Sequence, residues 1–275
     1  MKIETFIRRF EAGLEPLATL PIALARKRYD ALCQSFAPPD PAGMRIDDAA
    51  VDGLPLRRFV PAGAARAPVV FLHGGGFTLG SSASHHGIAA SLAQALGREV
   101  ISLDYPRAPE ASYAATTRRC IDVIEALCPA ALVGDSAGAR LAMDCSHAAG
   151  LEVPLGLVYP PVNDLRAQTL GPDAPLLSRQ DVLFLSPLCP PLGDASPTPL
   201  PNSVVEVLAV EHDPLTAPLE RVVAAWRREG ASVGYRCAPH MVHAALHAHA
   251  HLPEMQSAWQ TFCQALKDHL GAAYS

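Results

Sequence analysis

Short apolar runs alternate with helix-like segments from about residue 50, and this order restricts the fold more than any other feature of the chain. A repeated strand–helix order predicts an α/β fold with a mostly parallel sheet and helices on both faces. An antiparallel hairpin around Gly53 is expected to open the sheet. The expected strands span residues 54–60, 68–73, 99–104, 131–135, 153–159, 204–210 and 232–237, and the expected helices span residues 83–96, 112–127, 137–149, about 219–229 and 255–270.

Two segments lie outside this pattern. In the segment that ends near residue 43, apolar side chains from Ile3 to Leu14 recur at helical spacing, which predicts an amphipathic helix. Residues 160–203 contain ten prolines, which disfavour a continuous strand or a long helix. A long irregular insertion in a compact domain is often a lid or a binding loop, so this stretch is a candidate cover for a site.

The composition is that of an ordinary globular domain, with 49% hydrophobic and 18% charged residues and a net charge of −5. The absence of a Lys/Arg run argues against a nucleic-acid partner, and no apolar run is long enough to span a membrane. The seven cysteines are dispersed without a Cys-x-x-Cys pair, which is typical of reduced thiols. Because the first residues also lack a signal-peptide pattern, the sequence predicts a cytoplasmic protein.

A Gly-Asp-Ser-Ala-Gly run at 134–138 follows one expected strand and opens the next expected helix. This is the context of a nucleophile elbow, a tight turn that projects a serine hydroxyl above the sheet. Glycines two residues before and after Ser136 leave room for neighbouring backbone. The turn also places the N–H of Ala137 at a helix N-terminus, where it faces developing negative charge. Ser136 is therefore the candidate nucleophile, against the alternative of an ordinary glycine-rich turn.

A His-Gly-Gly-Gly-Phe run at 73–77 follows an earlier expected strand. Consecutive glycines leave backbone N–H groups unshielded, so these groups can approach a ligand oxygen. We expect Gly74 and Gly75 to give two donors of an oxyanion hole, with Ala137 giving the third. Alone, the run is equally compatible with a flexible turn, and its place one strand before the elbow favours the functional interpretation.

A serine hydroxyl needs a histidine base, which is oriented in turn by a carboxylate. In a sheet with a nucleophile elbow, the chain order is serine, acid, histidine. Asp213 and Glu211 both follow the strand expected at 204–210, and Asp213 has the better reach. His240 and His243 both follow the last expected strand, so the residues leave the choice of base open.

Further histidines lie just beyond, at positions 247, 249 and 251. His243 and His247 are four residues apart and would share one face of a helix as metal ligands. No carboxylate or cysteine ligand lies nearby in the sequence, and surface histidines often accumulate without binding anything. We therefore expect no metal site.

Taken together, these motifs resemble those of the hormone-sensitive lipase family of α/β-hydrolase carboxylesterases, from about residue 50 to the C-terminus. The resemblance implies that Asp213 is the triad acid and that His243, rather than His240, is the base. It implies an α/β-hydrolase fold in a single domain, 1–275, in which 1–45 and about 161–203 contribute a cap. The motifs that carry it lie at 73–77 (His-Gly-Gly-Gly-Phe), 104–110 (Asp-Tyr-Pro-Arg-Ala-Pro-Glu), 134–138 (Gly-Asp-Ser-Ala-Gly), 213–215 (Asp-Pro-Leu) and 239–243 (Pro-His-Met-Val-His).

The family resemblance further implies hydrolysis of short-to-medium acyl esters, with a small-molecule ester as partner and no cofactor. It leaves room for a homodimer paired through an edge strand. Some positions depart from the family pattern: Ala244 and Ala245 stand where Gly-Phe is usual, and Arg140 stands where a small or amide residue is usual. A further departure is Ala217-Pro218, where an acidic pair is common.

These departures leave the acyl preference open, and we name Phe77, Phe184 and Leu185 as candidate apolar lining. Three alternatives remain: an amidase or formamidase with the same triad, a non-catalytic ligand-binding homologue, and a metal-dependent hydrolase.

Overall fold

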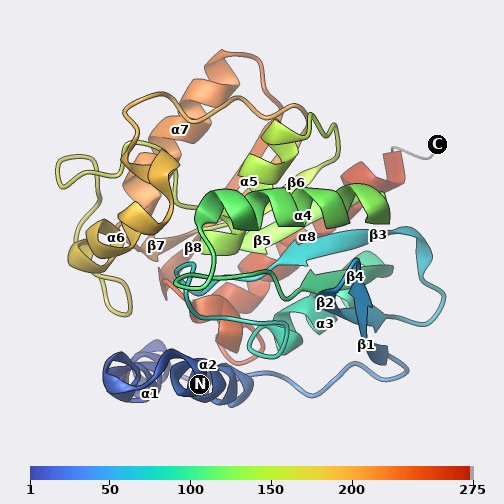
Figure 1. Cartoon of the computed structure of the whole chain (residues 1–275), viewed down its shortest axis with the longest axis horizontal. Coiled ribbons are helices and arrows are strands. Elements are labelled where there is room, and N and C mark those ends of the chain that lie inside the picture. Colours follow the sequence, from blue (N-terminus) through green and yellow to red (C-terminus); the bar gives the residue numbers. More distant parts are fainter. Residues whose placement is uncertain (273–275) are drawn as a thin grey trace.

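A mixed β-sheet forms the centre of the molecule (Figure 1), whose computed structural model describes residues 1–272. The strands are β1 (Arg45–Val51), β2 (Leu54–Val60), β3 (Ala65–Leu72), β4 (Arg98–Leu103), β5 (Ala131–Asp135), β6 (Leu155–Val158), β7 (Val205–His212) and β8 (Val233–Val242). Within these residues they form one eight-stranded sheet in the order β1-β2-β4-β3-β5-β6-β7-β8. β2 is antiparallel to both β1 and β4, and the other neighbouring strands are parallel.

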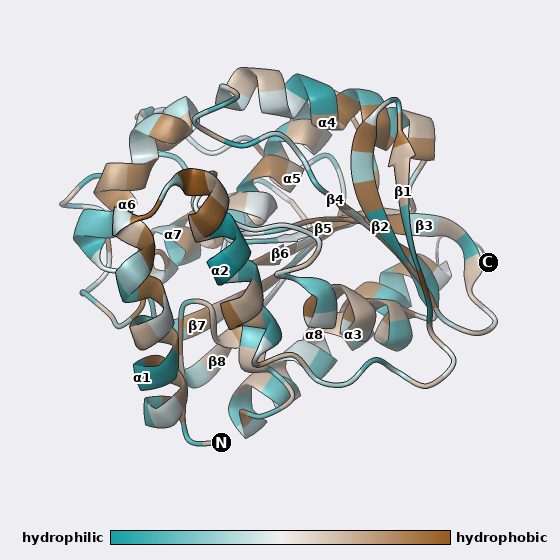
Figure 2. Ribbon diagram, turned by 60° about the horizontal axis from the view of Figure 1, so that its bottom comes forward, coloured by the Kyte–Doolittle hydropathy of each residue, from teal (hydrophilic) through white to brown (hydrophobic). Residues whose placement is uncertain are grey.

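Helices cover both faces of the sheet. Figure 2 shows α3 (His86–Leu96) and α8 (Pro253–Ala272) on one side, with α4 (Tyr113–Leu127) and α5 (Ala137–Ala148) on the other. The remaining α-helices are α1 (Ile3–Leu14), α2 (Ile22–Gln34), α6 (Arg179–Leu185) and α7 (Thr216–Arg228), and the 3-10 turns are η1 (Glu15–Thr19), η2 (Ser186–Leu188), η3 (Pro190–Gly193) and η4 (Ala245–Ala248).

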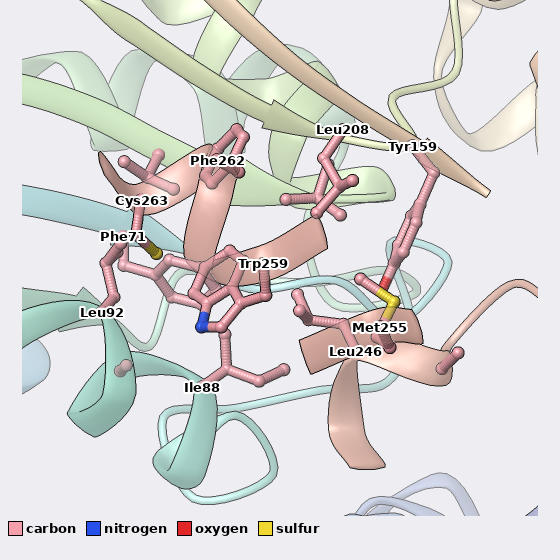
Figure 3. Packing of buried hydrophobic residues seen from close by; sticks show 14 of the residues in the cluster. Phe71, Ile88, Leu92, Tyr159, Leu208, Leu246, Met255, Trp259, Phe262 and Cys263 are labelled. Atoms are coloured by element: carbon pink, nitrogen blue, oxygen red, sulfur yellow. The ribbon is translucent and has the colours of Figure 1, made fainter. Parts of the chain in front are cut away.

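Two hydrophobic cores lie on opposite faces of the sheet, as period-two alternation along buried strands requires. Along β3, Val69 and Phe71 belong to the core under α3 and α8, whereas Val70 and Leu72 belong to the core under α4, α5 and α7. In the first core Trp259 stacks on Phe262 with ring centroids 5.3 Å apart, beside residues of α3 (Figure 3). The fully buried central strands hold the carboxyl ends of the sheet rigidly in place.

Residues with turn-forming or helix-capping preferences lie at the ends of several helices and strands. The expected hairpin is formed by β1 and β2, which are joined by Asp52 and Gly53 with φ of 50° and 78°. Two positive φ values are what a type I′ hairpin turn needs, and an Asp-Gly pair adopts them readily. Gly97 ends α3 in the left-handed conformation, and the Ser112 side chain accepts a hydrogen bond from the N–H of Ala115 at the start of α4.

β8 differs most from the expected strands. It was expected at 232–237 but continues through Pro239 to Val242. Proline is tolerated because β8 is an edge strand, and the β7–β8 register shifts between Val210 and His212, where His240 has a φ of 60°. The longer strand therefore ends directly before His243.

α1, α2 and α6 lie outside the layers, and both views place them toward the same end of the molecule (Figures 1 and 2). α1 and α2 are anchored by an aromatic cluster in which Phe6 lies 5.3 Å from Phe10 and 5.1 Å from Phe36 between ring centroids. The proline-rich stretch forms α6 and short 3-10 turns, without a strand of the sheet among the residues that the structure describes.

No helix within residues 1–272 combines the length and apolarity that a bilayer crossing requires. The seven cysteines are all free thiols, five of them buried.

Candidate active site

Ser136 occupies the sharp turn between β5 and α5, with φ of 50° and ψ of −122°. The turn requires glycine at the positions two residues before and two residues after Ser136. A Cβ on Gly134 would lie 2.5 Å from the carbonyl of Gly138, and a Cβ on Gly138 would lie 2.0 Å from the carbonyl oxygen of Leu72. The N–H of Ser136 donates to the carbonyl of Val158 at 2.8 Å, which ties the turn to the neighbouring strand. The sequence thus folds locally so that the serine hydroxyl stands at the carboxyl edge of the sheet.

Three side chains from the ends of three different strands meet at this edge. Nε2 of His243 lies 2.9 Å from Oγ of Ser136, and Nδ1 of His243 lies 2.7 Å from Oδ2 of Asp213. Asp213 follows β7 and His243 follows β8. A carboxylate only accepts, so Nδ1 of His243 carries the proton and Nε2 is free to accept the serine hydroxyl. This is the arrangement that makes a serine hydroxyl nucleophilic.

The Asp213 side chain has no exposure to solvent, and its second oxygen accepts the N–H of Leu215 at 2.8 Å. The alternative acid and base lie elsewhere. Glu211 is exposed and accepts the N–H of His240 at 2.7 Å, while the His240 imidazole is itself largely exposed. The structure therefore brings together Asp213 and His243, and it separates Glu211 and His240 from Ser136.

The structure corrects the expectation for Gly74. Its N–H donates to Oδ1 of Asp135 at 2.9 Å, so it is not available to an oxyanion. The N–H groups of Gly75 and Gly76 meet no acceptor within residues 1–272, and both glycines line the cavity that contains Ser136. Gly76 was not among the oxyanion donors expected from the sequence. The signal for Gly76 was Asp135, the acidic residue directly before Ser136. Asp135 is buried and accepts the N–H of Gly74, the first glycine of the run.

Ala137 is the first residue of α5, where the N–H has no intrahelical acceptor. Its N–H remains a candidate oxyanion donor, and the helix dipole favours negative charge at this point. The candidate donors at the site are thus the backbone N–H groups of Gly75, Gly76 and Ala137. We call residues 73–77, which contain two of them, the oxyanion loop.

A cavity of about 330 Å³ opens above Ser136. Its walls come from the segments outside the layers, with Phe10 and Leu14 from α1 and Leu185 from α6. Phe184 also lines the cavity, and 77% of this residue is exposed, which places it at the mouth. The full lining is Phe10, Leu14, Tyr29, Gly75, Gly76, Thr78, Leu79, Asp135, Ser136, Tyr159, Leu176, Leu177, Asp181, Phe184, Leu185, His243, Ala244 and His247.

Phe77 is not part of this lining, contrary to expectation. Its φ of 63° turns the side chain away from the cavity, and the buried ring packs edge-on against Tyr113 with centroids 5.4 Å apart. The departure at Arg140 is also accounted for by packing. Its buried guanidinium donates to Asp144 at 2.9 Å and to Asn163 at 2.7 Å. Arg140 thus joins α5 to the proline-rich stretch behind Ser136.

Of the three histidines just beyond His243, only His251 is exposed. His247 and His249 are buried, and burial lowers the pKa of His247 to about 3. His247 stacks on Phe10 and its Nε2 lies 3.6 Å from Sγ of Cys33. Because His243 and His247 each face other partners, they do not converge on a common point as metal ligands would.

Within residues 1–272, the one group of side chains close enough to share an ion is Glu211, His212 and His240. All three are exposed, and exposed groups of this kind are common without a metal.

Tyr159 was not singled out from the sequence, although it ends an expected strand. Its ring lies 4.5 Å from that of His243 between centroids, and it extends from the end of β6 toward Met255 and Leu246 (Figure 3). The hydroxyl is buried and meets no partner among the described residues. The ring therefore acts as an apolar wall behind the imidazole of His243.

Comparison of the sequence with known protein families identifies a match. A model of the α/β hydrolase fold matches residues 69–247. The putative acetyl-hydrolase LipR of Mycobacterium tuberculosis is 34% identical over 170 residues, which cover 56% of this chain and 54% of that protein. Bovine hormone-sensitive lipase is 34% identical over 137 residues, which cover 44% of this chain and 18% of that protein. The chain thus spans about half of the first relative's length and a smaller share of the second's.

Among solved structures, a hormone-sensitive lipase from a metagenome library superimposes with a TM-score of 0.81. The match covers 98% of this chain and 99% of that one at 21% identity, so it supports the fold rather than the chemistry. The fold class predicted from the sequence is confirmed. The chain belongs to the α/β hydrolase fold family, and the proteins to which it is similar include hormone-sensitive lipases.

Proposed function

We propose that the chain hydrolyses carboxylic esters through an acyl-enzyme intermediate on Ser136. The observation that carries the proposal is the continuous hydrogen-bonded path from Asp213 through His243 to Ser136 at the floor of an apolar cavity. Each group has the partner that its role requires: the acid is buried, the base is oriented, and the nucleophile faces open space.

Acylation begins when Oγ of Ser136 attacks the ester carbonyl carbon while Nε2 of His243 takes the hydroxyl proton. The carbonyl electrons move onto oxygen, and the N–H groups of Gly75, Gly76 and Ala137 stabilise that charge. The tetrahedral intermediate then breaks the bond to the alcohol oxygen, which receives the proton from His243. The alcohol leaves, and the acyl group stays on Ser136.

Deacylation repeats these steps with water as nucleophile. His243 takes a proton from the attacking water, and the same donors stabilise the second oxyanion. When the bond to Ser136 breaks, His243 returns the proton to Oγ and the carboxylic acid leaves. Asp213 keeps the His243 imidazole in the productive tautomer and stabilises the cation that forms in each half-reaction.

The cavity supports an acyl preference in the short-to-medium range. Its volume of about 330 Å³ and its walls of Phe10, Leu14 and Leu185 suit an apolar chain of limited length. We propose that residues 1–45 and about 161–203 act as the cap of a single domain, because side chains from both segments line this space. The name of the mycobacterial relative, a putative acetyl-hydrolase, supports a small acyl group.

The proposed steps take every proton donor and acceptor from the chain or from water, so the proposal includes no cofactor. The partner is a small-molecule ester. Because all seven cysteines are free thiols, we also propose a reducing compartment such as the cytoplasm.

Covalent labelling tests the proposal. A fluorophosphonate should modify the intact protein once, and peptide mapping should place the adduct on Ser136. Ser136→Ala should abolish labelling, whereas Ser257→Ala, a matched change on the exposed side of α8, should leave it intact. An unlabelled, folded protein would favour a ligand-binding role. Faster turnover of matched amides than of esters would favour the amidase alternative.

A further inference from the structure

A buried hydrogen-bond network lies directly beneath the oxyanion loop. We propose that His85 is a positioning residue: it holds Asp135 against the N–H of Gly74 and so fixes the oxyanion loop. The proposal rests on the ester hydrolysis proposed above and assigns a role to a side chain that touches neither the triad nor the cavity. His85 is fully buried, at the residue directly before α3.

The Asp135 carboxylate has one partner for each oxygen. Oδ1 accepts the N–H of Gly74 at 2.9 Å, and the same Gly74 nitrogen lies 3.2 Å from Nε2 of His85. Oδ2 of Asp135 lies 3.2 Å from that Nε2. Burial raises the pKa of the Asp135 carboxyl. His85 and the Gly74 N–H lower this pKa by more than burial raises it, so the net pKa lies below its usual value. A buried carboxylate is costly to leave unpaired, so Asp135 has a strong preference for the position in which both bonds form.

His85 is itself fixed from the other side of its ring. Nδ1 lies 2.8 Å from Oγ of Ser84, which accepts the Ser81 N–H at 2.8 Å. A hydroxyl has one proton, so when Ser84 donates it to Nδ1 rather than to the Ser81 carbonyl 2.9 Å away, Nε2 of His85 carries the ring proton and donates it to Asp135. The ring packs against His247 with centroids 4.6 Å apart. Held by a turn and by a packed neighbour, the imidazole directs Nε2 toward Asp135.

Peptide geometry carries this constraint to the oxyanion donors. The carbonyl of Gly74 and the N–H of Gly75 belong to one planar trans peptide and point in opposite directions. Nδ1 of His73 lies 2.8 Å from the Gly74 carbonyl oxygen, which fixes that plane and therefore the direction of the Gly75 N–H. The preceding plane is fixed through the Gly74 N–H by Asp135 and through the His73 carbonyl by the Tyr105 hydroxyl.

The loop also has no space for a larger residue at its first glycine. A Cβ on Gly74 would lie 2.5 Å from Oδ2 of Asp135 and 3.0 Å from the Asp135 carbonyl. The close approach is what allows Asp135 to take the Gly74 N–H, and it leaves the next two N–H groups for the substrate. Loss of His85 would free Asp135 to rotate, and the oxyanion donors would lose their alignment while the cavity walls stayed in place.

A pair of amide substitutions tests the role. In His85→Asn the amide reaches the position of Nδ1, which keeps Ser84 as a partner but cannot reach Asp135. In His85→Gln the amide reaches the position of Nε2 and restores a donor to Asp135. His249→Asn is the matched control, because His249 is a buried imidazole that bonds only the Leu246 carbonyl among its described partners and lies outside the loop.

The measurements are kcat and KM for p-nitrophenyl butyrate and the inhibition constant of 1,1,1-trifluoro-2-hexanone, which forms an oxyanion when Ser136 adds to it. We expect His85→Asn to lower kcat about 10- to 100-fold with KM nearly unchanged, because misplaced groups cost rate rather than binding. The inhibition constant should rise by a similar factor. His85→Gln should recover most of the rate, and His249→Asn should behave as wild type.

Equal rates for His85→Asn and wild type would overturn the inference, as would parallel losses in both His85 variants and His249→Asn. Absence of Ser136-dependent turnover in the wild type would overturn the proposed function instead. If His85→Asn does not fold, Ser84→Ala replaces it: it removes the partner of Nδ1 and should lower kcat by a smaller factor, again without raising KM. An unchanged kcat in Ser84→Ala would then overturn the inference.

Discussion

Oδ2 of Asp213 lies 2.7 Å from Nδ1 of His243, and the Asp213 side chain is closed to solvent. Substitution of this acid by its amide tests whether it sets the histidine tautomer. An amide at this position can donate to Nδ1, which would place the imidazole proton on Nε2. A protonated Nε2 cannot accept the hydroxyl proton of Ser136. We expect Asp213→Asn to lower kcat by about 10⁴-fold, the loss known for the equivalent change in another serine hydrolase. A loss of less than tenfold, with the exposed Asp194→Asn as control, would contradict the role of Asp213.

The turn that carries Ser136 depends on the absence of a side chain at Gly138. A Cβ there would lie 2.0 Å from the Leu72 carbonyl oxygen and 2.4 Å from that of His73, both of which are backbone atoms. Gly138→Ala should lower the free energy of unfolding by about 1–3 kcal/mol or more, the range for overpacking, and should remove activity. Urea unfolding measures the change. Gly271→Ala, where a Cβ meets open space near the end of α8, should be neutral; a neutral Gly138→Ala would contradict the described turn.

Burial of His247 predicts sensitivity to acid. Its pKa is about 3 in the folded chain, against about 6.5 for an exposed histidine. Between these pH values the unfolded chain binds a proton here that the folded chain does not, so stability falls as pH falls. The slope from this group is about 1.4 kcal/mol per pH unit. His247→Gln should flatten the pH dependence of unfolding between pH 6.5 and 4.5.

The control for this prediction is the exposed His251→Gln, which should leave the slope unchanged. His73 and His249 have pKa values lowered by burial and contribute in the same direction, so His247→Gln removes only part of the acid sensitivity. Equal slopes for His247→Gln and wild type in urea unfolding would show that this imidazole is accessible to protons in the folded state.

Phe184 at the cavity mouth should act on long acyl chains only. Most of its surface is exposed, so Phe184→Ala should leave the unfolding free energy nearly unchanged. For p-nitrophenyl decanoate we expect KM to rise about 3- to 10-fold, from the loss of roughly 1 kcal/mol of apolar contact, and for the acetate we expect no change. Leu200→Ala removes another exposed hydrophobic side chain away from the cavity and serves as control. A decanoate KM in Phe184→Ala equal to that of the wild type would exclude the mouth as an acyl contact.

The fold was predictable because strand and helix signals follow one another regularly. Short apolar runs bounded by residues such as Gly97 and Ser112 marked the layers, and glycine spacing marked the turn at Ser136. The end of β8 was not predictable in the same way. Pro239 signals a strand end, yet at an edge strand with a bulge at His240 the pairing continues.

The details of the site depended on side-chain contacts that no local pattern encodes. Gly74 and Gly75 are equivalent in the sequence, and only the approach of Asp135 distinguishes the engaged N–H from the free one. The direction of Phe77 follows from a positive φ. Ala244 likewise adopts a φ of 65°, the conformation that the family's usual glycine favours, so the departure in residue type preserves the backbone.

Every proposed step depends on Ser136 as the nucleophile. The most direct test is turnover of p-nitrophenyl butyrate by the wild type and by Ser136→Ala, with folding of both checked by circular dichroism. The proposed mechanism predicts clear turnover in the wild type and a loss on the order of 10⁶-fold in the variant, as for removal of the nucleophile in another serine hydrolase. Activity in Ser136→Ala within tenfold of the wild type would contradict it.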